Sequence, residues 1–72
     1  MKSYVFAGKE ISKVQDISYE LLQEELFIRV QARVDTFISQ GGKLTNESFQ
    51  VLVNESIEGI IADVDALARQ LE

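Results

Sequence analysis

The sequence predicts a small α+β domain that is mostly α-helical. An N-terminal β-hairpin is followed by an antiparallel hairpin of two helices, which is expected to dimerise into a helical bundle. Three observations predict this fold. Strand-forming residues surround a single glycine near the N-terminus, a long segment without Pro or Gly follows, and a second segment carries an apolar stripe at spacings of three and four. Residues 1–72 have the size of a single domain.

Residues 3–12 are predicted to form the β-hairpin, because aromatic and β-branched residues that favour strands lie on both sides of Gly8. Gly8 followed by Lys9 fits a two-residue type II′ loop, which favours Gly at its first central position. A two-stranded hairpin is only marginally stable alone in water. We therefore expect the hairpin to pack on the helices or to pair with a second copy of the chain.

Residues 13–40 are predicted to form the first helix, since this segment contains no helix-breaking residue. Ser12 begins a sequence with the spacing of a capping box, and Asp16 is a competing N-cap one turn later. Gly41-Gly42 is expected to end the helix, because Gly readily adopts the left-handed conformation beyond a helix C-terminus.

The first helix is apolar on two opposite faces. The broad arc comprises Tyr19, Leu22, Leu26, Phe27, Val30, Val34, Phe37 and Ile38. The second arc comprises Val14, Ile17, Leu21, Ile28 and Ala32. The first helix needs only one apolar face to pack on the second helix of the same chain. The other apolar face therefore indicates association with a partner.

Residues 45–71 are predicted to form the second helix, with Thr45 or Asn46 as its N-cap. Its apolar stripe is expected to pack on the broad arc of the first helix. The stripe comprises Phe49, Val53, Ile57, Ile60, Ile61, Val64, Leu67, Ala68 and Leu71. Gly59 lies on the opposite face, where its cost of about 1 kcal/mol relative to Ala is expected to be tolerated rather than to reflect a close neighbour.

The second arc is the predicted self-association site, because its spacings resemble the seam of a coiled coil. The alternative is that the hairpin covers it from within the same chain. That cover could reach Val14, Ile17 and at most Leu21, since Ile28 lies about 16 Å further along the helix than Ile17.

The net charge is −5, and the whole excess lies in residues 44–72. Nucleic-acid binding needs a basic footprint, so we expect no direct contact with nucleic acid. The chain has no Cys and no His, which excludes disulfides and the usual thiolate or imidazole metal ligands. Oligomerisation is then the remaining way to stabilise so small a domain.

The acidic edge of the second helix is the predicted surface for a different protein. It comprises Glu47, Glu58, Asp65 and Glu72, which fall within about 40° on a helical wheel. Weak cation binding and simple solvation are the alternatives. Arg29 and Arg33 lie one turn apart beside the broad arc. They are expected either to pair with nearby acids such as Glu25 or to set the register across a helical interface.

No pattern of a catalytic site, metal site or cofactor site is present. The hydroxyl residues lack a nucleophile context such as G-x-S-x-G, and Gly41-Gly42-Lys43 lacks the earlier Gly of a phosphate-binding loop. The N-terminus has no apolar signal segment, and no apolar run approaches the roughly 18 residues of a membrane span. We therefore expect a cytoplasmic protein that is not an enzyme, has no cofactor and does not contact a membrane.

The sequence favours a non-enzymatic protein-interaction module that is homo-oligomeric through the first helix. It would act as a regulator, inhibitor or assembly factor by binding another, unidentified protein. A homodimer is the expected oligomer because two-fold closure is the commonest symmetry. The alternative is an acidic decoy that competes with nucleic acid for a DNA-binding protein.

Overall fold

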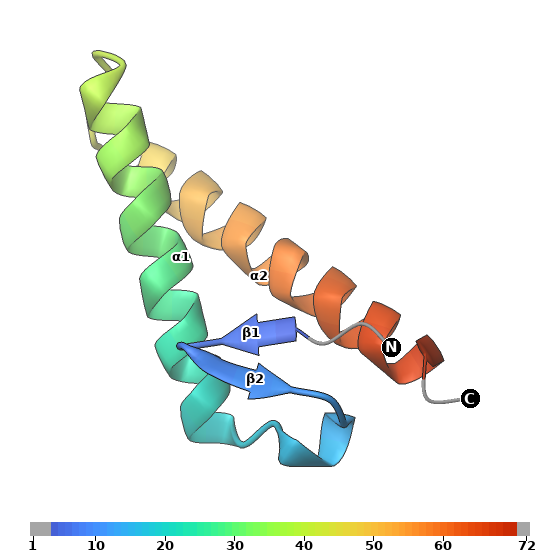
Figure 1. The fold of residues 1–72 in the computed structure, drawn as a ribbon. Helices are drawn as coiled ribbons and strands as arrows, with labels where there is room; N and C mark the ends of the chain where they lie inside the picture. The colour runs from blue at the N-terminus through green and yellow to red at the C-terminus, as the bar shows by residue number, and fades with distance from the viewer. Residues whose placement is uncertain (1–3, 71–72) are drawn as a thin grey trace.

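The computed structural model describes residues 4–70 and has the predicted order of elements. Strands β1 (Tyr4–Phe6) and β2 (Lys9–Ile11) form an antiparallel hairpin, and a short 3-10 turn, η1 (Val14–Asp16), leads into two long helices. These are α1 (Tyr19–Ser39) and α2 (Asn46–Gln70), which cross while the hairpin lies beside the first half of α1 and the end of α2 (Figure 1). The predicted fold class is confirmed, and pairing with a second copy remains a prediction.

The hairpin turn is Ala7-Gly8, so the predicted Gly8-Lys9 turn is wrong by one residue. The register pairs Phe6 with Lys9 and Tyr4 with Ile11, which leaves Ala7 and Gly8 as the two loop residues. Both have positive φ, +52° and +79°, as a type I′ turn requires. Because Lys9 pairs with Phe6, the buried side chains of Phe6 and Ile11 fall on the same face of the hairpin.

The first helix begins later than predicted, at Tyr19 rather than at residue 13. Its N-cap is Ser18, whose hydroxyl accepts a hydrogen bond from the Leu21 amide at 3.1 Å. The capping box predicted at Ser12 is therefore wrong, and so is Asp16 as an N-cap. The preceding segment turns through η1 instead, which lets Val14 and Ile17 pack beneath the hairpin.

Both ends of the connection between the helices follow the prediction. Gly41 has φ +86°, its amide donates to the Ile38 carbonyl at 3.0 Å, and the Gly42 amide donates to the Phe37 carbonyl at 2.9 Å. This is the Schellman pattern that ends many helices. On the far side, the Thr45 hydroxyl accepts from the Ser48 amide at 3.1 Å and caps α2.

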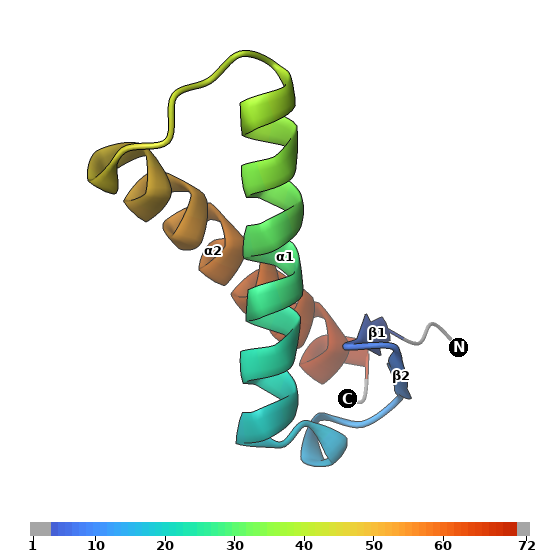
Figure 2. The same cartoon turned by 90° about the vertical axis from the view of Figure 1, so that its left-hand side faces the viewer.

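The fully buried apolar core is small and lies under the hairpin. Phe6, Ile11 and Leu67 are its centre, and side chains from η1, α1 and α2 pack around them. The helices themselves cross obliquely and diverge on either side of the crossing (Figure 2). Within residues 4–70, neither helix is long and apolar enough to cross a membrane.

Candidate interaction surface

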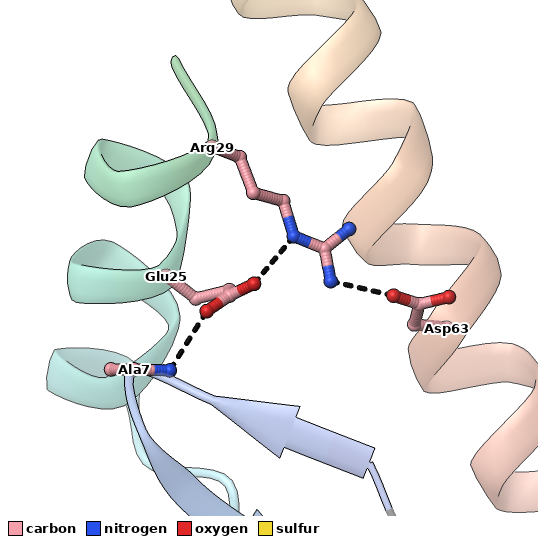
Figure 3. Close-up of polar contacts among 4 residues, drawn as sticks. All are labelled: Ala7, Glu25, Arg29 and Asp63. Carbon is pink, nitrogen blue, oxygen red and sulfur yellow. Dashed lines mark hydrogen bonds and ion pairs between the residues drawn. The ribbon is translucent and has the colours of Figure 1, made fainter. Parts of the chain in front are cut away.

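The two helices meet through a polar contact centred on Arg29 (Figure 3). Its Nε donates to Oε2 of Glu25 on the same helix at 2.6 Å, and its Nη2 donates to Oδ2 of Asp63 on α2 at 2.6 Å. Oε1 of Glu25 accepts the Ala7 amide of the hairpin turn at 2.8 Å. The guanidinium also lies 5.8 Å from the ring centroid of Phe6. One network therefore joins the hairpin, α1 and α2.

The charges in this network compensate one another. Burial lowers the pKa of Arg29, but hydrogen bonds and electrostatic attraction from Glu25 and Asp63 outweigh it, and the net pKa is raised. Glu25 is buried, and both of its carboxylate oxygens have a partner. Among the described residues, no buried side-chain oxygen or nitrogen lacks a hydrogen bond. The contact is therefore a polar seam in which every buried side-chain oxygen and nitrogen has a hydrogen-bond partner.

Small residues on α2 let this seam close. A Cβ at Gly59 would lie 3.1 Å from Nη1 of Arg29, so a neighbour does approach closely there and the expected open surface is wrong. Ser56 is fully buried one turn earlier, and its hydroxyl donates to the Leu52 carbonyl at 2.9 Å. Leu52 is buried as well. The buried side of α2 therefore combines two stripe residues, Ile60 and Leu67, with Leu52 and Ser56 from outside the stripe.

The apolar faces of both helices are rotated away from the seam by roughly a quarter turn. Packing of the α2 stripe directly on the broad arc of α1 was predicted, and this prediction is wrong for the largest side chains. Tyr19 is 75% exposed, Phe27 67% and Ile61 61%. The exposed apolar residues also include Ile38, Phe49 and Ile57. The reason is that Arg29, Glu25 and Asp63 occupy the crossing.

Three grooves run between the two helices on the side where these apolar residues are exposed, and two of the grooves adjoin each other. One is lined by Tyr19, Leu22, Gln23, Leu26, Ile57, Ile60 and Ile61. A second shares three of these residues and continues to Val64, Asp65 and Ala68. A third is lined by Phe27, Val30, Gln31, Val34 and Phe49. We call these residues together the apolar face.

The second arc is divided by the fold. Val14, Ile17 and Leu21 pack against the core under the hairpin, which is the alternative that the sequence left open. Ile28 is 50% exposed and Ala32 is exposed, as expected from their distance along the helix. Self-association through these two residues remains a prediction, but the seam that would have joined all five does not lie open on one surface.

The acidic edge is only partly described, since Glu72 lies outside the described residues. Glu47, Glu58 and Asp65 are all exposed on α2. Asp65 pairs with Arg69 one turn later, with Nη2 3.1 Å from Oδ2. Their use by a partner protein remains a prediction.

The two arginines have different roles. Arg29 makes the predicted pair with Glu25, and it also makes a pair across the helix–helix contact, which is the alternative role considered for it. Arg33 is exposed and has no ion-pair partner among residues 4–70. Asp63 was not singled out from the sequence, because an acid on α2 that reaches α1 cannot be distinguished by spacing from its solvated neighbours.

No known protein family, no curated protein and no solved structure matches this chain. Within the described part of the chain, no three carboxylates gather as a metal site would require.

Proposed function

We propose that the protein is a non-enzymatic protein-interaction module and that the apolar face is its binding surface. The supporting observation is the exposure of Tyr19, Phe27 and Ile61 on one side of a molecule whose own core is covered by the hairpin. Large contiguous apolar patches are rare on monomeric soluble proteins and usually mark a binding surface. Aromatic residues are also enriched at the centres of protein interfaces.

The charges around the apolar face suit this role. Asp65 is the single charged residue among those that line its grooves. A partner can therefore cover the centre without burying an unpaired charge. Glu47 and Glu58 of the acidic edge do not line these grooves and would stay at the rim, where they keep the chain soluble and are open to a second protein.

An acidic decoy is the weaker proposal. It draws on the charge excess of residues 44–72, but Asp63 and Asp65 each pair with an arginine of the same chain. Those pairs reduce the negative potential that a nucleic-acid mimic needs.

Site-specific photo-crosslinking tests the interaction function. A photoreactive amino acid at position 61 samples the apolar face, and the same amino acid at position 28 samples an equally helical, exposed position on the second arc. Irradiation in an extract of the native cells should give protein adducts from position 61 and few from position 28. The absence of adducts from position 61 would contradict the proposed function.

A further inference from the structure

We propose that a second copy of this chain covers the apolar face, so that the two helices of one copy pack on the two helices of the other. This inference rests on the proposed function, because it names the partner of that same surface. It assigns self-association to the broad arc and the α2 stripe, rather than to the second arc.

The exposed area of the single chain is the first argument. A folded monomer of 8.1 kDa exposes about 4,500 Å², whereas this chain exposes 5327 Å². The excess is several hundred Å². Each partner in a stable interface of ordinary size gives up about 800 Å². The chain thus exposes about as much surplus surface as one half of a dimer interface requires.

The shape of the single chain is the second argument. Its radius of gyration is 13.8 Å, while a compact domain of this length has a radius of about 11 Å. The molecule measures 42 × 20 × 19 Å because its two helices are long, with 21 and 25 residues, and they diverge from their crossing (Figures 1 and 2). A second pair of helices packed on the apolar face would form a second layer, and the assembly would then be compact.

The chemistry of the face is the third argument. Its centre consists of aliphatic and aromatic side chains, with Gln23 and Gln31 as the uncharged polar residues among them. An identical copy presents the same surface, so a two-fold axis brings like apolar residues together. Dimerisation would give this chain, which has a small core and no cysteine, the stability that disulfides provide in other small domains.

The test is the mass of the purified full-length chain in solution, measured by light scattering or sedimentation across a concentration series. We expect twice the 8.1 kDa of one chain at high concentration and a decrease on dilution. Ile61→Glu should weaken this association by more than about 10-fold, because each copy would bury a charge in the interface. Ile28→Glu is the matched control and should leave the dimer intact. Circular dichroism of both variants checks that they remain helical.

The outcomes separate this inference from the proposed function. A wild-type chain that stays monomeric at every concentration overturns self-pairing, while adducts from position 61 to other proteins would still support an interaction module. A dimer that Ile28→Glu dissociates and Ile61→Glu does not would overturn the choice of face and favour the second arc. A dimer that neither variant changes would overturn it as well.

Discussion

Arg29 and Asp63 join the two helices across 34 residues of sequence, with Nη2 of Arg29 2.6 Å from Oδ2 of Asp63. Arg29 also binds Glu25 at 2.6 Å, and Glu25 holds the amide of Ala7 in the hairpin turn. The same three side chains therefore link the crossing of the helices to the hairpin turn. Beside this seam, Tyr19 and Phe27 of α1 and Ile61 of α2 remain exposed.

Removing Asp63 should destabilise the fold more than removing its neighbour on the exposed side. Asp63→Ala leaves Arg29 without its partner on α2 and should lower the free energy of unfolding by about 1 kcal/mol. The side chain is 35% exposed, so solvent screening limits the loss. Asp65→Ala removes an exposed pair and should cost under about 0.5 kcal/mol. Urea denaturation of both variants compares them, and equal losses would argue against the seam.

Glu25 should control the attachment of the hairpin. Glu25→Ala breaks the bonds to Ala7 and Arg29 together and should lower stability by about 2 kcal/mol. It should also speed hydrogen exchange at the Ala7 amide, which loses its acceptor. Glu24→Ala changes an exposed carboxylate on the same helix and should leave that exchange unchanged. Both rates can be read by NMR, and unaltered exchange in Glu25→Ala would refute the link.

Gly59 should be coupled to Arg29. Gly59→Ala gains about 1 kcal/mol of helix propensity, but its Cβ would lie 3.1 Å from Nη1 of Arg29. We expect the net gain to be well below 1 kcal/mol in the wild-type background. In the Asp63→Ala background Arg29 can move, so the gain should increase. A double-mutant cycle measures this difference, and additive effects would mean that the close approach has no energetic consequence.

Salt should strengthen the proposed dimer. Each copy has a net charge of −5, so two copies repel each other while their apolar faces attract. Salt screens the repulsion and leaves the burial of apolar surface intact. The dissociation constant should therefore fall as sodium chloride is raised, as measured by sedimentation equilibrium. A constant that rises with salt would indicate an interface held by opposite charges.

Features that depend on a few neighbouring residues were predictable. The Gly41-Gly42 helix end, the Thr45 cap and the Glu25–Arg29 pair each involve groups at most five positions apart. The turn and the start of α1 were missed because competing local solutions exist. Ala7-Gly8 and Gly8-Lys9 differ by one residue, and Ser12, Asp16 and Ser18 can all cap a helix.

By itself, the sequence determined that a β-hairpin precedes two helices. It also determined that the helices carry more apolar surface than they can bury by packing against each other. Periodicity and capping suffice for that, because they act within single elements. Only the tertiary structure decided which sides of the helices meet. That choice depends on Arg29 reaching Asp63 past Gly59 and on Glu25 reaching Ala7, contacts between distant residues whose energy appears when the elements pack together.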